Sequence, residues 1–407
     1  GRWLFVCQPL EPKPESVRAL KRWADFVASG VTELWLKPNY AAYMPGERAT
    51  LTLQTQRLSR RLSASAKETW RFELTVEREG SGSPEWTERL EAEVSGELNA
   101  VRLPLPFAVE SGLYRAVCRA TAPNGESRTL RQAFWGHDEA LLAKGKPIGR
   151  GRDYFIQDGR PLPVVGMTYM ASDVARKFLQ LPNADVWDRD MAQMKKAGIN
   201  WIRTGIWTAY RHVMFADGHA SEEALRAVDA FLLTAARHDL HVTFTFFSFT
   251  PETWEGINPY LDPRSLEAQK RFVRSIVSRH RKTTHVDWDL INEPSMFDPA
   301  RIFSDGPRSA RDPFERKAFS DWLKRRHGSI EALQERWNMT PEQLPDFAAA
   351  LPPEPEEINF SVQDIHSGKK GTRWLDYCLF SMDMHNAWAK ELRDTIKELC
   401  PEHLVTV

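Results

Sequence analysis

The residue of this chain best placed to do chemistry is a carboxylic acid at the end of a short apolar and acidic run. The run reads Asp287-Trp288-Asp289-Leu290-Ile291-Asn292-Glu293-Pro294. Side chains alternate along a strand, so Trp288 and Leu290 share one side and the acidic residues share the other. Pro294 has no N–H to donate and ends the strand. The pattern predicts that Glu293 stands at the carboxyl end of a strand, where barrel enzymes carry their catalytic groups.

The elements that must position Glu293 alternate between strands and helices. Strands are predicted at 163–169, 200–206 and 241–247, before the acidic strand, and at 404–407 after it. Helices with apolar stripes are predicted between them at 185–197, 221–238 and 265–279. This order predicts a parallel sheet with right-handed crossovers, as in a (β/α)8 TIM barrel. No glycine-rich turn follows the first strand, which disfavours a dinucleotide-binding sheet.

The part of the chain before this series has a different pattern. Short strands separated by turns are predicted from 34 to 135, with alternation that indicates one buried face. We therefore expect an all-β sandwich at 31–136, a linker and an Asp-Gly hairpin at 137–160, and the N-terminal part of the barrel at 161–407. Residues 1–30, with an amphipathic helix at 16–27, are expected to be the tail of an upstream domain or a connector.

The regular alternation stops after Glu293. Helices are predicted at 312–326, 329–337 and 372–399, with an irregular proline-rich segment at 351–358. The last helix is expected to use Leu375, Leu379, Met382, Trp388, Leu392 and Ile396 as core positions. Because a barrel needs about 250 residues and only about the first five strands are found, we expect a segment of a longer protein, cut within its barrel. The alternative is that further strands lie unrecognised in 295–400.

Composition argues against several classes of function. Lys+Arg and Asp+Glu are both 55, and a net charge of zero disfavours nucleic acid and acidic membranes as partners. No apolar run reaches the length of a membrane span. The 4 cysteines form no C-x-x-C pair, and no His cluster or G-x-S-x-G motif occurs, so no cofactor or metal is expected. An oligomer is possible, and the compartment stays open.

Two stretches together resemble a known family. Trp201-Ile202-Arg203 at the second strand and residues 290–294 at the fourth are similar to the retaining glycoside hydrolases of clan A, on (β/α)8 barrels. The resemblance covers about 155–407, and the preceding sandwich looks most like the β-galactosidase-like branches. It implies hydrolysis of a β-linked carbohydrate by double displacement, with Glu293 as general acid/base. Partial burial, which we expect at this position, would raise the pKa of such a group.

The resemblance also implies roles for neighbouring residues. Asn292 would hydrogen-bond the sugar 2-hydroxyl, and Arg203 would keep the nucleophile ionised. From the residues alone, Arg203 is equally well explained as the partner of Asp289 in a buried ion pair. The clan's nucleophile is a Glu at the seventh strand, which is missing here, so we expect it beyond Val407. Glu252 and Glu255 have no counterpart in the clan.

Aromatic residues at strand ends, such as Tyr169, are expected to line the sugar cleft, and the best placed are Trp207 and Trp254. The other interpretation of each is packing between loops. A rival for the whole chain is a non-catalytic carbohydrate-binding protein on a degenerate barrel. A further rival is a barrel enzyme of other chemistry that shares Asn-Glu-Pro by chance.

Overall fold

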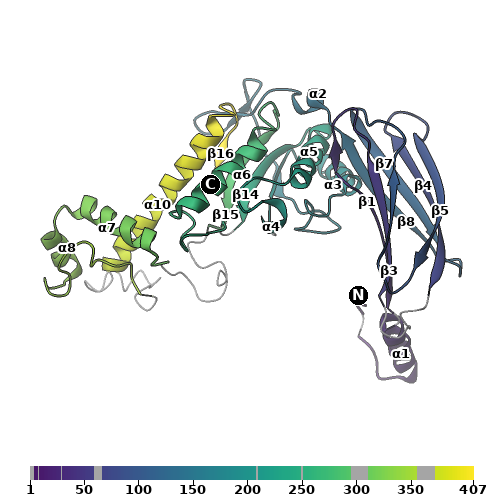
Figure 1. Cartoon of the computed structure of the whole chain (residues 1–407), viewed down its shortest axis with the longest axis horizontal. Coiled ribbons are helices and arrows are strands. Elements are labelled where there is room, and N and C mark those ends of the chain that lie inside the picture. The colour runs from purple at the N-terminus through teal and green to yellow at the C-terminus, as the bar shows by residue number, and fades with distance from the viewer. Residues whose placement is uncertain are drawn as a thin grey trace.

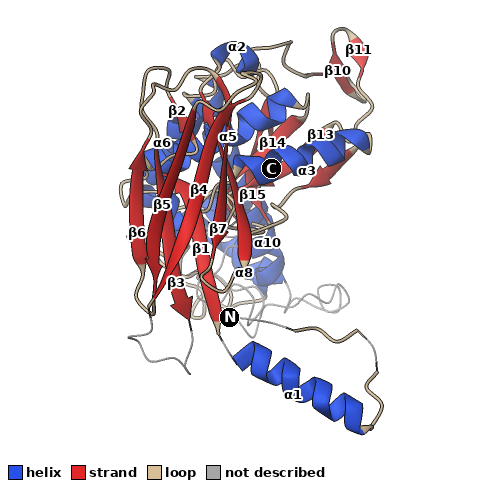
Figure 2. Ribbon diagram, turned by 90° about the vertical axis from the view of Figure 1, so that its right-hand side faces the viewer, coloured by secondary structure: helices blue, strands red, loops and turns tan. Residues whose placement is uncertain are grey.

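The computed structural model describes residues 4–7, 9–28, 30–58, 67–207, 210–248, 251–294, 310–354 and 372–407. Within them, a two-sheet unit lies beside a unit built on a parallel sheet, and further helices extend from the second unit (Figure 1). The N-terminal helix α1 (Pro14–Ala28) has no buried residue and projects away from the sheets (Figure 2). The predicted helix is therefore present, and its apolar residues stay outside the cores of the two units.

The two-sheet unit contains every strand predicted between 34 and 135. One sheet has the order β1 (Val31–Pro38), β3 (Thr50–Leu58), β6 (Asn99–Pro104). The other has the order β2 (Ala42–Tyr43), β8 (Ser127–Gly136), β7 (Gly112–Thr121), β4 (Glu68–Arg78), β5 (Trp86–Val94). Inward side chains of both sheets, such as Leu51, Phe72 and Tyr114, form one hydrophobic core. The alternation of buried and exposed residues along β4 is the one that the sequence predicts.

The second unit holds a parallel sheet whose strands follow one another in chain order. They are β12 (Gly166–Thr168), β13 (Trp201–Gly205), β14 (His241–Ser248), β15 (Val286–Asn292) and β16 (Val405–Thr406). The helices α3 (Ala184–Lys196), α5 (Glu222–Arg237) and α6 (Pro263–Val277) connect the first four strands. No closed barrel is formed by the described residues, because this sheet has only these members.

Short elements lead from one unit to the other. They are α2 (Glu139–Leu142), β9 (Gly149–Arg150), β10 (Phe155–Gln157) and β11 (Arg160–Pro161), and α4 (Tyr210–Val213) follows β13. The hairpin of β10 and β11 turns at Asp158 and Gly159, whose φ angles of 51° and 75° are those of the predicted Asp-Gly turn.

Both faces of β15 are buried, and they differ in character. Trp288 stacks on Phe246, with ring centroids 5.2 Å apart, on the apolar side of the sheet. On the other side Asp287 contacts His241, with Oδ2 and Nε2 2.6 Å apart, and Asp289 contacts Arg203. The alternation predicted from the sequence is therefore the one that the strand adopts.

The helices after Glu293 form an aromatic bundle. They are α7 (Pro313–His327), α8 (Ile330–Trp337) and α10 (Thr372–Lys397). Of the core positions predicted on α10, Trp388, Leu392 and Ile396 are buried, and Leu379 is partly buried against the core. The prediction was wrong for Met382, which is 62% exposed, and Leu375 is only partly buried. The helix instead buries Trp374, Tyr377 and Phe380, which pack around Phe319 of α7 and Trp337 of α8. The predicted irregular segment lies mostly outside the described residues. No described helix has both the length and the apolar character that crossing a bilayer requires.

Polar contacts join the two units along β7, β8, α3 and α5. Arg115 of β7 donates to Asp185 and Asp188 of α3 at 2.9 and 2.6 Å. Burial opposes ionisation of Asp188, but hydrogen bonds from His238 and Arg115 hold its pKa well below the usual range. The ionised Asp188 carboxylate therefore stabilises the fold fully above a pH of about 4, the usual pKa of an Asp in the unfolded chain. This stabilisation is lost as the pH falls towards the lowered pKa of Asp188 in the folded protein. These contacts form a seam that holds the two units together.

Replacing Arg115 by Ala removes the partner that these carboxylates share. We expect Arg115→Ala to lower the free energy of unfolding by about 2 to 3 kcal/mol, measured by urea denaturation. Arg119→Ala, an exposed position on the same strand, is the control and should cost less than about 0.5 kcal/mol. Equal losses in both variants would contradict the assignment.

Candidate active site

The candidate site lies at the carboxyl edge of the parallel sheet, where a single guanidinium links two strands. Arg203 of β13 donates from Nε and Nη2 to Asp289 Oδ2, the first at 2.9 Å, and from Nη1 to Asn292 Oδ1, also at 2.9 Å. The Asp289 side chain is only 2% exposed, and Thr245 Oγ1 of β14 donates to it at 2.7 Å. The interpretation of Arg203 as the partner of Asp289 is therefore realised.

The hydrogen bonds of Arg203 and Thr245 to Asp289 require β13, β14 and β15 to lie close together. A Cβ added at Gly205 would lie 2.2 Å from the backbone oxygen of Thr245, so only glycine allows β13 to approach β14 there. Thr245 pairs with Gly205 on one side and with Asp289 on the other. The three strands are thus held in the register that brings Arg203 beneath Asn292.

Glu293 follows directly and leaves the strand in a strained conformation. Its φ is 49°, in the left-handed region that residues other than glycine seldom adopt, and Pro294 is next. Glu293 is exposed in the part of the chain that is described, which differs from the partial burial expected from the sequence. Backbone strain of this kind costs on the order of 1–3 kcal/mol and is often kept at functional sites. The turn projects Glu293 past the end of β15.

Among the aromatic candidates, Trp207 joins the site and Tyr169 does not. The Arg203 guanidinium lies 5.5 Å from the centroid of the Trp207 ring, which is only 5% exposed, and no described group accepts from its Nε1. The Tyr169 ring is 2% exposed and packs on Phe231 of α5, with centroids 5.7 Å apart. Its hydroxyl donates to Asp190 of α3 at 2.9 Å. Packing, the second interpretation of Tyr169, is thus the one that its contacts support.

Trp254 lies in the segment between β14 and α6, which a carboxylate holds in place. Asp262 Oδ2 accepts hydrogen bonds from the backbone N–H groups of Trp254, Glu255 and Gly256 at 2.8, 2.8 and 3.0 Å. Burial would raise the pKa of Asp262, but these donors keep it below its usual range. The Trp254 ring is partly buried, with the Arg264 guanidinium 5.6 Å from its centroid.

The same segment is tied to the helices that follow the site. Asp312, which caps α7, accepts from the N–H groups of Ile257 and Asn258 at 2.7 and 2.9 Å. Glu315 accepts from Asn258 Nδ2 at 3.1 Å and from the Tyr377 hydroxyl at 2.8 Å. Burial, with the nearby Asp312 charge, raises the pKa of Glu315. The α7–α10 helices therefore fix the position of the segment that carries Trp254.

The sequence interpretation missed these carboxylates as site supports. A signal was available, because Asp262 precedes Pro263 and Asp312 precedes Pro313, and Asp followed by Pro is a frequent start of a helix. What the sequence does not show is that each carboxylate also captures a distant backbone segment. In the part of the chain that is described, no cluster of His, Cys, Asp or Glu is arranged to hold a metal ion.

Removing the Asp312 carboxylate should release this segment. In Asp312→Ala we expect the amides of Ile257 and Asn258 to exchange with solvent about tenfold faster or more, because each loses a charged acceptor. Hydrogen exchange resolved by peptide or residue measures this. Ser329→Ala, which removes the cap of α8 without touching the segment, should leave both amides unchanged. Unchanged protection in Asp312→Ala would rule out this anchoring.

Comparison with known proteins shows which class of protein the chain resembles. A family model described as beta-galactosidase, that of glycoside hydrolase family 42, matches residues 266–407, which include β15 and Glu293. A β-galactosidase of Bifidobacterium bifidum is 25% identical in an alignment 239 residues long, which covers 53% of this chain and 32% of that protein. These matches confirm the resemblance to β-galactosidase-like glycoside hydrolases of clan A, and glycosidase is the class of enzyme that they support.

Solved structures of glycoside hydrolases also match. A β-glucuronidase of Parabacteroides merdae is 15% identical, with 75% of this chain and 32% of that chain covered and a TM-score of 0.27. An exo-β-1,4-mannosidase of an Opitutaceae bacterium is 15% identical, with 61% and 32% covered and a TM-score of 0.34. This chain thus spans 32% of the length of the β-galactosidase relative and of each of these two structures.

Proposed function

We propose that the protein containing this chain is a retaining, β-galactosidase-like glycosidase in which Glu293 is the general acid/base. The observation that carries the proposal is the Arg203–Asn292 hydrogen bond of 2.9 Å immediately before Glu293, at the carboxyl end of β15. It leaves a hydrogen-bonding amide and an exposed carboxyl group side by side. Backbone strain is kept at active sites and at ligand clamps alike, so the strained Glu293 supports a functional position, and the similarity to glycoside hydrolases favours the enzyme over a carbohydrate-binding protein.

The proposed reaction has two steps. In the first, the Glu293 carboxyl group donates its proton to the glycosidic oxygen while a nucleophilic carboxylate attacks the anomeric carbon and the bond to the leaving group breaks. In the second, the Glu293 carboxylate takes a proton from water, whose oxygen attacks the anomeric carbon and displaces the nucleophile. The exposure of Glu293 lets leaving group and water reach the same carboxyl group in turn.

Arg203 prepares Asn292 for a sugar hydroxyl. A guanidinium can only donate hydrogen bonds, so the Asn292 atom that faces it must be the oxygen Oδ1. The Nδ2 amino group is thereby turned away from Arg203 and remains a donor for the sugar 2-hydroxyl. Asp289 holds the guanidinium in place, and Trp207 lies under it. Trp254 remains a candidate for the cleft wall.

The wider architecture belongs to the same proposal. The two-sheet unit is the sandwich at 31–136, residues 137–160 form the linker and hairpin, and the parallel sheet is the first part of a (β/α)8 barrel. The nucleophile is a Glu beyond residue 407, about 5–5.5 Å from Glu293 in the assembled site. The substrate is a β-linked carbohydrate.

The test is Glu293→Gln in the full-length protein. We expect turnover of β-glycosides with poor leaving groups to fall at least about a thousandfold, since these need protonation, while aryl glycosides with very good leaving groups lose far less in the first step. Added azide should restore turnover by replacing water in the second step and should yield a β-glycosyl azide.

Glu255→Gln provides the matched control, because Glu255 is also an exposed acid near the carboxyl edge of the sheet. Its rates should stay within about twofold of the unaltered protein, as for a surface change. Equal losses for good and poor leaving groups in Glu293→Gln would remove the acid/base role. Sugar binding without turnover in the unaltered protein would favour the carbohydrate-binding alternative.

A further inference from the structure

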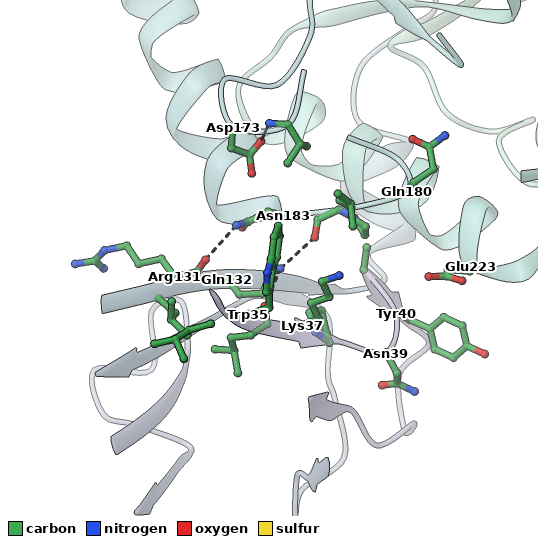
Figure 3. Close-up of a pocket in the computed structure, with 18 of the residues that line it drawn as sticks. Trp35, Lys37, Asn39, Tyr40, Arg131, Gln132, Asp173, Gln180, Asn183 and Glu223 are labelled. Atoms are coloured by element: carbon green, nitrogen blue, oxygen red, sulfur yellow. Dashed lines mark hydrogen bonds between the residues drawn. The ribbon is translucent and has the colours of Figure 1, made fainter. Parts of the chain in front are cut away.

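A hollow of about 310 Å³ lies at the seam between the two units, away from the β15 edge. Its floor comes from β1 and β8 of the two-sheet unit, and its roof is the segment that leads from β12 into α3 (Figure 3). This volume is at the lower end of the range of small-molecule sites. Nothing in the proposed hydrolysis uses this hollow.

The two walls are held at a fixed separation. Gln132 of β8 donates from Nε2 to the backbone oxygen of Pro182 at 3.1 Å, and Asn183 donates from Nδ2 to the backbone oxygen of Arg131, also at 3.1 Å (Figure 3). The Arg115 ion pairs fasten α3 to the same sheet a short way along. The hollow is therefore preformed, and a ligand would bind without the cost of ordering a loop.

The indole ring of Trp35 lines the hollow. On β1, Leu36 points into the core of the two-sheet unit, so Trp35 points to the other side, and it is 40% exposed. Figure 3 shows it projecting from β1 towards the wall that carries Asn183. The Lys37 ammonium lies 4.9 Å from the centroid of its ring. A large flat apolar surface is thus offered beside a hydrogen-bond donor.

The charged side chains that line the hollow are equal in number for the two signs. They are Lys37, Arg131, Asp173 and Glu223, and no ion pair is found between any of them and another described residue. Burial raises the pKa of Asp173, whose Oδ1 accepts from the backbone N–H of Val174 at 2.7 Å and which lies on the wall opposite β1 in Figure 3. Balanced but unpaired charges do not select an anion or a cation. They suit a neutral ligand with many hydroxyl groups, which donate to carboxylates and accept from ammonium.

We propose that this hollow is a second, non-catalytic binding site for a neutral sugar of one or two rings, which packs its C–H face on Trp35 and donates hydroxyl hydrogens to Asp173. A second hollow of about 460 Å³, lined by His212 and Val213 after β13, shares Leu181 and Glu223 with the first. A longer chain of sugars would continue along it towards α4. The proposal rests on the hollow alone and does not require Glu293 to be catalytic.

The test uses fluorine NMR of the full-length protein labelled with fluorotryptophan. The resonance that disappears in Trp35→Phe is that of Trp35. We expect this resonance to shift when galactose, glucose, mannose or lactose is titrated into the millimolar range. In Asp173→Asn, which keeps the shape of the side chain, the affinity from the same shift should fall about tenfold, as expected for a lost charged hydrogen bond.

Two controls separate this site from the candidate active site. Asp153→Asn, an exposed change outside the hollow, should leave the affinity unaltered, and turnover of small aryl glycosides should be unaltered in Asp173→Asn. No shift of the Trp35 resonance with any of the four sugars, or an equal affinity in Asp173→Asn, overturns the proposal. A shift without any glycosidase activity would support the hollow and reject the proposed hydrolysis instead.

Discussion

The candidate site depends on keeping one guanidinium charge half-enclosed within a sheet. The Arg203 side chain is 35% exposed, and its partner Asp289 is 2% exposed. Separating such a pair leaves a buried charge without compensation, which costs several kcal/mol, so the pair fixes how far β13 is shifted along β15. The residues that follow Asp289 on β15 are positioned by the same pair. Asn292 is aligned by the same guanidinium, and Glu293 begins where the strand stops.

A second constraint comes from segments that have no regular secondary structure of their own. The stretch between β14 and α6 satisfies its backbone donors with the carboxylates of Asp262 and Asp312. One carboxylate starts the next helix in the chain, and the other starts a helix that lies after Glu293 in sequence. Because Glu315 and Tyr377 are bonded beside the second of these, a change in the packing of α10 is transmitted to the backbone near Trp254.

The order of strands and helices was readable from the sequence because each element carries its own period. Alternation identified the strands, and apolar stripes identified the helices. For the candidate site, the sequence predicted only the placement of residues that are neighbours in the chain, and β15 does end at Asn292, directly before Glu293. The contacts of Tyr169 could not be predicted in this way, because the residues that enclose it, Phe231 and Asp190, come from two different helices.

The same limit explains the error in α10. A long helix with many apolar residues has more than one possible buried stripe, and Met382 belongs to a stripe that faces solvent. Aromatic partners on α7 and α8 determine which stripe of α10 is buried, and the positions of these partners follow from tertiary packing. The supporting role of Glu315 has the same origin, since a buried carboxyl group has no signature in composition or period.

The seam between the two units has a consequence for how the chain is made. Arg226 of α5 binds Glu47, a residue 179 positions earlier, and Trp135 donates to Thr234 across 99 positions. The two-sheet unit leaves the ribosome before α5 is synthesised. Until α5 has folded onto it, the surface of β8 that carries Trp135 is uncovered. An unprotected apolar surface on a half-finished chain is a target for chaperones and for aggregation. Yield during expression should therefore respond to changes at Trp135 more sharply than the stability of the finished protein does.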